Sequence, residues 1–449
     1  MQKPPAPGRT AVLKADRVPI DVLIDPFTRF SGMEASGGIL LLAATVIALA
    51  WANSPWEHGY HAIWEREVTA GLGRTVLTWS RHLWVNDGLM SVFFFLVGLE
   101  IKRELLIGEL SSFKRAAFPF VAALGGCLLP AALYLAVNHG TPEAHAWGIP
   151  MATDIAFALG VLALLGNRVP ASLKLFVAAL AIADDIVAVL VIAIFYTARL
   201  NFFYLGLGAI GLVISYAANK AGIRSPWVYG FIGVLVWFAV MQSGVHATIA
   251  GVLLAFTIPY KSSTDKQGFV AKVQRLLERF EAAEGDSTEA QAALDAMEEQ
   301  CARMESTLNR IEHGLQPWVS FVIMPLFAFS NAGVHVLGNL VAAAKNPVTL
   351  GVGVGLVIGK PFGITAFAWA AERTKLAARP AGVSWMQIFA AAWVCGIGFT
   401  MSLFIATLAL HQGGPLDLAK IGTLGASVVA GCIGCVLLLR SSQRSEQQI

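Results

Sequence analysis

Four ionisable residues lie in stretches that are otherwise too apolar to hold a charge. Asp184 and Asp185 are adjacent in the middle of the apolar run 175–196, Asp154 lies in the apolar run before it, and Lys360 is the one charge of a later run. At the centre of a bilayer each such group costs roughly 2.5–3.5 kcal/mol, or about 10 kcal/mol for all four if unpaired. These residues are therefore expected to pair, to line a wet cavity or to perform work.

The types of these residues point to cation and proton chemistry. A buried ion pair that fixes helix register accounts for Lys360 and one aspartate, but it leaves two carboxylates unmatched. Adjacent helix residues point about 100° apart, so Asp184 and Asp185 cannot both face one partner. Carboxylate and hydroxyl oxygens suit hard cations, and burial with mutual repulsion favours the protonated carboxyl group. Competition between a proton and a cation for the same oxygens is the minimal chemistry of antiport.

Two of the apolar runs are interrupted by helix-breaking residues. Freed backbone groups at bilayer depth are tolerated only beside a cavity or within protein, and interrupted helices in corresponding positions mark the binding site of inverted-repeat transporters. Close packing of glycine-rich membrane helices is the other interpretation. The residues concerned are Gly148 and Pro150 in the first run and Gly396, Gly398 and Thr400 in the second.

The composition predicts a membrane protein. The chain of 449 residues is 56% hydrophobic and 14% charged, whereas soluble domains are about 25% charged. The net charge of +3 is too small to suggest nucleic-acid binding. Twelve runs approach the length of about 20 residues that a spanning helix needs. They are 37–53, 84–108, 116–137, 146–166, 172–196, 202–219, 226–242, 245–260, 317–337, 347–371, 385–410 and 418–439.

The distribution of Lys and Arg orients these spans. Basic residues concentrate in alternate loops, as expected for cytoplasmic loops when both termini are cytoplasmic. The segment 54–83 is the exception, because it mixes three arginines with three glutamates. We expect a multi-pass protein of the bacterial inner membrane. The loops that supply the pattern contain Lys102, Arg103, Lys114, Arg115, Arg168, Lys174, Lys220, Arg224, Arg373, Lys375 and Arg379.

A charged insertion divides the expected membrane domain. Residues 261–316 hold seven Lys or Arg and eleven Asp or Glu in two heptad-like runs, which predict a cytoplasmic helical hairpin. A solvated amphipathic linker and a regulatory element are both open interpretations. The expected organisation is a cytoplasmic tail (1–36), spans one to eight (37–260), the insertion (261–316), spans nine to twelve (317–440) and a second cytoplasmic tail (441–449).

The five cysteines show no metal-ligand arrangement, and four of them lie in apolar runs, where a free thiol behaves as a small hydrophobe. We expect no disulfide, no resident metal and no cofactor. The first residues lack the apolar core of a cleaved signal peptide.

Seven strings give the chain a resemblance to the NhaA-type sodium/proton antiporters, from about residue 25 to 440. Together they are far more specific than any single motif. The strings are FFFLVGLEIKREL (93–105), ATDIAFA (152–158), ADD (183–185), SGVHAT (243–248), PLFAFSNAG (325–333), GKP (359–361) and GIGFTMS (396–402).

The resemblance implies a fold and residue roles. The fold is an all-α polytopic membrane protein of about twelve helices, with inverted repeats and two discontinuous helices that cross. Asp185 is then the primary ligand of a transient Na+, and Asp184 alternates between an ion pair with Lys360 and ion or proton binding. Thr153 and Asp154 lie at the helix crossing, where Asp154 and Lys360 offset the half-helix dipoles.

The resemblance also implies a response to pH and a dimer. The residues it assigns to pH response are Glu100, Arg103, Glu104, Glu312 and His313, with His246 on the other side of the membrane. Charges at helix ends also serve simply to anchor a span. A homodimer is expected through the 54–83 loop, with a hairpin in residues 57–70. Two departures from the family are the long insertion at 261–316 and Val187, which follows the aspartate pair where small residues are common.

The predicted function is electrogenic antiport of cytoplasmic Na+ or Li+ against external H+, by alternating access. The protein is expected to be a secondary transporter, not an enzyme. An intramembrane aspartyl protease needs aspartates on two helices, one in a Gly-x-Gly-Asp string that this chain lacks. A channel remains an alternative that conductance recordings decide. A sodium-coupled transporter of related fold with an organic substrate is the main alternative.

Overall fold

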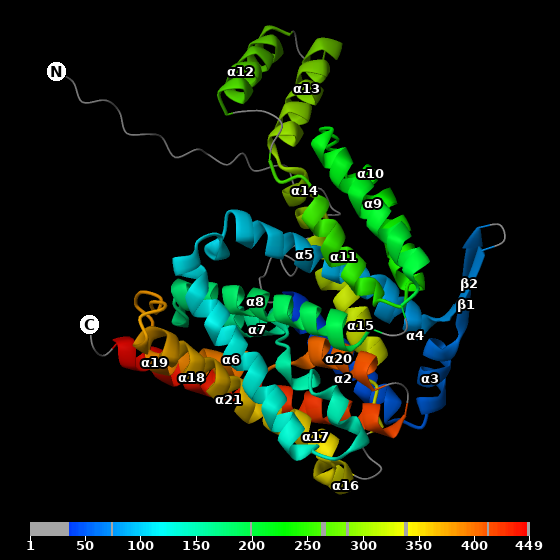
Figure 1. Cartoon of the computed structure of the whole chain (residues 1–449). Helices are drawn as coiled ribbons and strands as arrows, with labels where there is room; N and C mark the ends of the chain where they lie inside the picture. Colours follow the sequence, from blue (N-terminus) through cyan, green and yellow to red (C-terminus); the bar gives the residue numbers. More distant parts are fainter. Residues whose placement is uncertain are drawn as a thin grey trace.

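The computed structural model describes residues 36–72, 75–197, 200–261, 266–283, 287–335, 340–410 and 413–446. The expected N-terminal tail lies outside this part, apart from Ser36, and residues 447–449 of the C-terminal tail also lie outside it. The described chain is almost entirely helical (Figure 1).

Seven described helical stretches are long and apolar enough to cross a bilayer. Two bent pairs of helices raise this number to nine, and shorter apolar helices occupy other expected spans. The predicted all-α polytopic membrane fold is therefore confirmed. The seven stretches are Arg81–Leu106, Arg115–Val137, Pro142–Leu164, Ala171–Phe195, Phe202–Lys220, Pro347–Arg373 and Gly414–Ser441.

The first half of the chain contains α8, the helix that carries the aspartate pair. α8, with 25 residues, is about 37 Å long and exceeds the hydrocarbon thickness of a bilayer. The elements up to the insertion are α2 (Ser36–Ala52), α3 (Glu57–Glu65), β1 (Glu67–Leu72), β2 (Thr75–Ser80), α4 (Arg81–Leu83), η1 (Trp84–Leu89), α5 (Met90–Leu106), η2 (Glu109–Ser111), α6 (Phe113–Val137), η3 (Pro142–Ala146), η4 (Ile149–Met151), α7 (Ile155–Leu164), η5 (Gly166–Arg168), α8 (Ala171–Phe195), α9 (Phe202–Lys220), α10 (Pro226–Gln242) and α11 (Ala247–Thr257).

The second half begins with the insertion and ends with the longest helix. Helix α21 continues past Arg440, where the C-terminal tail was expected to begin. The elements are α12 (Lys266–Ala282), α13 (Thr288–Met304), α14 (Thr307–Trp318), η6 (Val319–Ile323), α15 (Met324–Asn331), α16 (Leu340–Lys345), α17 (Pro347–Val354), η7 (Gly355–Gly359), α18 (Lys360–Arg373), α19 (Trp385–Val394), α20 (Phe399–Ala409) and α21 (Gly414–Glu446).

Glycines bring α6 and α18 into backbone contact. A Cβ atom built on Gly125 would lie 2.3 Å from the carbonyl oxygen of Gly363, and one built on Gly363 would lie 2.2 Å from that of Gly125. Any side chain at either position would force the helices apart. This close approach places α18 and α8 on α6 at the depth of the aspartate pair.

The insertion forms helices outside the bundle. Helices α12 and α13 lie against each other and stand clear of the membrane helices, as Figure 1 shows, and α14 leads the chain back into the bundle. Serine side chains cap two of them: Ser287 Oγ accepts from the Ala290 N–H at 3.2 Å and Ser306 Oγ from the Asn309 N–H at 3.1 Å.

A two-stranded ribbon projects from the bundle between α3 and α4 (Figure 1). Strands β1 and β2 pair antiparallel, from Glu67 opposite Ser80 to Leu72 opposite Thr75. The hairpin therefore lies later than the expected 57–70, because helix α3 occupies Glu57–Glu65.

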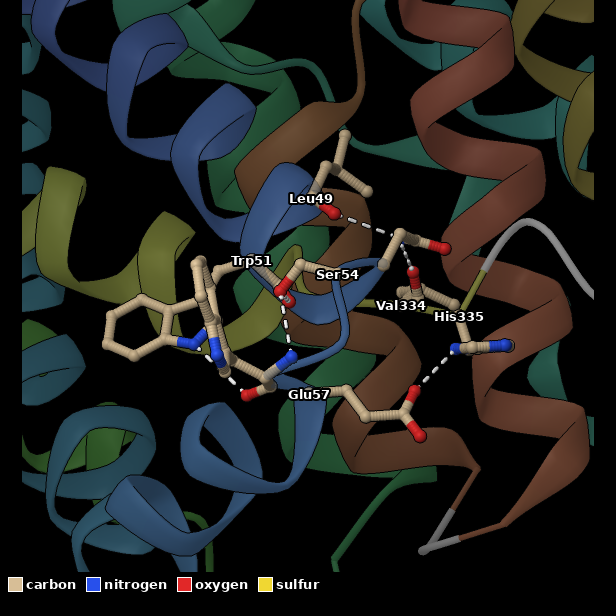
Figure 2. A network of polar contacts seen from close by, with 8 residues as sticks. Leu49, Trp51, Ser54, Glu57, Val334 and His335 are labelled. Carbon is tan, nitrogen blue, oxygen red and sulfur yellow. Dashed lines mark hydrogen bonds and ion pairs between the residues drawn. The ribbon is translucent and has the colours of Figure 1, made fainter.

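The corner between α2 and α3 is tied to the chain that follows α15 (Figure 2). The helices turn by 115° there. Asn53 Nδ2 donates to the Val334 carbonyl at 2.8 Å, and Glu57 Oε2 lies 3.0 Å from His335 Nδ1. The buried Tyr60 hydroxyl donates to the Phe329 carbonyl at 2.5 Å. These contacts link two segments nearly 300 residues apart.

Candidate functional site

The aspartate pair lies within α8 and is out of contact with solvent. Asp184 is 0% exposed and Asp185 2% exposed. As expected for helix neighbours, they have different surroundings. Lys360, also 0% exposed, donates from its ammonium group to Asp184 Oδ2. Asp185 Oδ1 is buried and has no hydrogen-bond partner among the described residues.

Lys360 reaches Asp184 from a distorted point of its helix. It is the first residue of α18, directly after the π-helical turn η7. A Cβ on Gly359 would lie 2.7 Å from Pro130 Cα, and one on Gly355 would lie 2.6 Å from Pro150 Cβ. The glycines of this turn therefore let it press against α6 and against the start of the first broken helix.

Asp154 caps both broken helices at once. It is the N-cap of α7, where its Oδ1 accepts from the Phe157 N–H at 3.0 Å. Its Oδ2 accepts from the Thr400 N–H at 3.0 Å and from the Thr400 hydroxyl. Since helix N-termini carry partial positive charge, one carboxylate offsets the ends of α7 and α20 together.

The two interrupted segments cross at this point. The Asp154 N–H donates to the Ile397 carbonyl at 2.8 Å, and the Thr153 hydroxyl donates to the Cys395 carbonyl at 2.9 Å. Thr153 thus satisfies a carbonyl at the end of α19, while α19 and α20 are bent by 49° about residues 395–398. The crossing satisfies backbone groups that the breaks leave free.

Glycine is required where the second break meets η7. A Cβ on Gly396 would lie 2.8 Å from the Leu356 carbonyl oxygen, and one on Gly398 would lie 2.2 Å from Ser402 Oγ. In the first break, the Gly148 N–H donates to the Tyr196 hydroxyl at 3.1 Å, and Pro150 contacts η7 as described above.

Two residues at this site were missed by the sequence reasoning. Ser402 Oγ donates to the Ile149 carbonyl at 2.7 Å and links α20 to the first break. The Cys127 thiol donates to Asp184 Oδ1 at 2.9 Å, so the interpretation of this cysteine as a small hydrophobe was incomplete. Ser402 belongs to a string that carried the resemblance, whereas no sequence signal connects Cys127 with α8.

A cavity of about 920 Å³ lies between α2, α5, α7, α8 and α14. Its lining includes the buried Ile182, one helical turn before Asp185, and Ile155, which follows Asp154. The partly exposed Arg103, together with Glu104 and His313, also lines it. The cavity lining therefore includes charged groups of α5 and α14 as well as residues near the aspartates in sequence.

Five of the six residues assigned to pH response, all but His246, gather beside this cavity. Arg103 pairs with Glu312 and lies 3.7 Å from Glu104 Oε1, and Glu100 lines the same cavity. Burial raises the pKa of the Glu312 carboxyl group above its usual value, while the Arg103 guanidinium opposes that rise.

The two histidines are placed differently. His313 lines the cavity and its Nδ1 lies 3.4 Å from Glu305 Oε1, with 65% of its side chain exposed. His246 lies apart from the group at the start of α11, where its Nε2 is 2.6 Å from the Tyr196 carbonyl oxygen.

The arrangement defines a class of protein: a polytopic membrane protein whose broken, crossing helices surround buried carboxylates and a buried lysine. The family model described as "Na+/H+ antiporter 1" matches residues 28–438. A Na(+)/H(+) antiporter NhaA of Koribacter versatilis is 59% identical over 95% of this chain and 93% of its own length.

Similar relatives occur in other bacteria. Antiporters named NhaA are 48% identical in Oleidesulfovibrio alaskensis, over 94% of this chain and 95% of the relative, and 46% identical in Helicobacter pylori, over 93% and 95%. The chain belongs to the Na+/H+ antiporter 1 family. This family indicates a multi-pass transporter of Na+ and H+.

Proposed function

We propose that the chain exports Na+ or Li+ from the cytoplasm in exchange for external protons, with Asp185 as the ligand that the cation and the proton compete for. The observation that carries this proposal is the buried Oδ1 of Asp185, which has no hydrogen-bond partner in the described part of the chain. A buried polar atom without a partner costs about 1–3 kcal/mol, and more when charged. A cation or a proton at this carboxylate removes that cost.

The neighbours of Asp185 make the competition effective. Asp184, Asp154, Glu100 and Lys360 all contribute to the potential at Asp185. The charge of Asp184 is offset by its ion pair with Lys360. A cation that enters through the cavity is therefore attracted mainly to Asp185. Proton release from Asp185 then accompanies cation binding. Exchange of more than one proton per cation makes transport electrogenic.

The broken helices provide a means of alternating access. Each broken helix contains a few non-helical residues, and hydrogen bonds between the segments at α7, α19 and α20 hold these residues in place. We propose that a core of α6 to α8 and α17 to α21 rocks against the remaining helices, so that the aspartates face one side of the membrane at a time.

We place the cavity on the cytoplasmic side of the bacterial inner membrane, with both termini cytoplasmic. Its charged lining belongs to the basic end of α5 and to α14, which follows the charged insertion. This side is the one that the positive-inside rule makes cytoplasmic. The domain limits predicted above remain part of this proposal.

We also propose a homodimer through the 54–83 loop. The β1–β2 ribbon projects from the bundle (Figure 1), and a two-stranded ribbon leaves unpaired backbone groups along its edges. Pairing with the ribbon of a second copy in the same membrane would satisfy these backbone groups.

The direct test is ion flux in proteoliposomes that contain the purified chain. A sodium gradient should drive proton movement of opposite direction without any organic solute, and an imposed membrane potential should change the rate. Lithium should replace sodium. Proton movement that requires an organic solute, or flux in the same direction as sodium, would contradict antiport and favour the sodium-coupled alternative.

Glu312→Gln should make the pH dependence of transport less steep and lower the apparent sodium affinity at alkaline pH. The raised pKa of Glu312 means that the carboxyl group ionises only as pH rises, when it pairs with Arg103 and adds negative charge beside the cavity. The measurement is the initial rate of sodium-driven proton flux between pH 6 and 9. Glu298→Gln is the matched control, because Glu298 is exposed on α13, outside the bundle, and its loss should leave the profile unchanged.

A further inference from the structure

Both carboxylate oxygens of Asp184 are occupied, each by a different helix. Lys360 of α18 donates to Oδ2, and Cys127 of α6 donates its S–H to Oδ1 at 2.9 Å. All three side chains are buried, with Cys127 3% exposed. Asp184 therefore differs from its neighbour Asp185, which has an oxygen without a partner.

The position of Cys127 results from the tight packing of α6 on α18. Cys127 lies two residues after Gly125, which makes backbone contact with α18, and a Cβ on the intervening Gly126 would lie 3.6 Å from Lys360 Cδ. The thiol is therefore held against the Lys360–Asp184 pair by the backbones of two helices.

The thiol has a second acceptor within reach. Its Sγ lies 3.9 Å from the carbonyl oxygen of Met151, the last residue of η4 at the first helix break. A protonated thiol is an uncharged, single weak donor. It can stabilise the ionised Asp184 without adding a charge of its own, and it can turn to the break if Asp184 takes up a proton or a cation.

We propose that Cys127 is a positioning residue of the antiport cycle, which holds Asp184 on Lys360 so that Asp185 receives the cation. This inference rests on the proposed function. The charged groups that act on the Cys127 thiol are Asp184 and Asp185 of α8 and Lys360 of α18. Asp154 at the first break and Glu100 of α5 act on Asp185, and Cys395 after α19 interacts with Lys360 and Asp184.

Transport by Cys127→Ala tests the inference. Cys127→Ala removes the donor that holds Asp184 Oδ1, so protons should compete better with the cation for the aspartate pair and the pH of half-maximal transport should rise by about half a unit. The apparent KM for sodium at fixed pH should rise roughly threefold, because protons compete better. The maximal rate at alkaline pH should stay near that of the wild type, whereas a merely structural defect lowers the rate and leaves the midpoint in place.

Cys127→Ser is the rescuing variant, because a hydroxyl group donates to the same carboxylate oxygen. It should restore the wild-type midpoint and KM. Cys432→Ala, at an exposed position of α21, is the matched control for loss of a thiol. An unmoved midpoint in Cys127→Ala, or the same shift in Cys127→Ser, would overturn the inference. Failure of the proposed function has a different signature, because the wild type itself would then lack sodium-driven proton flux.

The S–H stretching vibration gives a test that needs no transport. The infrared difference between the wild type and Cys127→Ser isolates the Cys127 band, and the difference with Cys432→Ala isolates the Cys432 band. A thiol bonded to a carboxylate should absorb at lower frequency than the exposed thiol. Equal frequencies would contradict the hydrogen bond to Asp184.

Discussion

Asp185→Asn should reduce sodium-dependent proton release from everted vesicles to the background of vesicles without the protein. The amide keeps the volume of the side chain but cannot take up or release a proton at physiological pH. It also removes the negative charge that a cation needs in a buried site, where Asp185 is 2% exposed. We therefore expect complete loss, not a shift of the pH profile.

A stability measurement and a control variant test whether the loss of activity has a cause other than the missing carboxylate. The variant should be as stable as the wild type or more so, because an orphaned buried carboxylate oxygen is replaced by a neutral group. Asp295→Asn is the control, since Asp295 is exposed on α13 and bonds to Gln291. Sodium-dependent proton release by Asp185→Asn at the wild-type rate would refute the assignment of the site.

Lys360→Met should destabilise the protein by about 3–5 kcal/mol, because it leaves Asp184 buried without its counter-charge. Methionine matches the length of the lysine stem, so packing against Gly126 is kept and the loss reports mainly the charge. The measurement is the thermal unfolding midpoint of the detergent-solubilised protein, followed by sodium-driven flux.

The double variant Lys360→Met with Asp184→Asn separates stability from function. Removal of both partners eliminates the unpaired charge, so most of the lost stability should return. Coupling of the proton to the cation should not return, because the pair no longer titrates. Lys345→Met, at an exposed position in the last turn of α16, should change neither quantity. Equal stability of Lys360→Met and the wild type would show that the pair carries no net stabilisation.

Much of the fold follows from the sequence, because lipid imposes severe rules. Apolar runs of spanning length must be helical, since backbone groups in lipid need internal partners. Four ionisable residues inside such runs stand out, because burying a charge in lipid is energetically costly. Pro150, Gly396 and Gly398 weaken their helices locally, and the chain breaks at these positions in the structure. Local chemistry was sufficient for these predictions.

Boundaries that depend on the competition between neighbouring elements were less predictable. The hairpin expected in 57–70 begins at Glu67, because the preceding residues form α3, whose buried Tyr60 bonds to the end of α15. That contact joins residues 269 positions apart. No local pattern within 54–83 contains it.

The tertiary structure decided which groups meet around the aspartates. The sequence alone identified Asp184, Asp185, Asp154 and Lys360 as costly charges, but it could not pair them without the family resemblance. Close packing of α6 on α18 brings Cys127 to Asp184, whereas Asp185 Oδ1 has no partner among the residues that the structure describes. Because the two breaks cross, the Asp154 carboxylate accepts hydrogen bonds at the N-termini of both α7 and α20. Composition and spacing show which charges are costly to bury. The partner that offsets each charge depends on contacts between helices that are distant in the chain, and these contacts exist only in the tertiary structure.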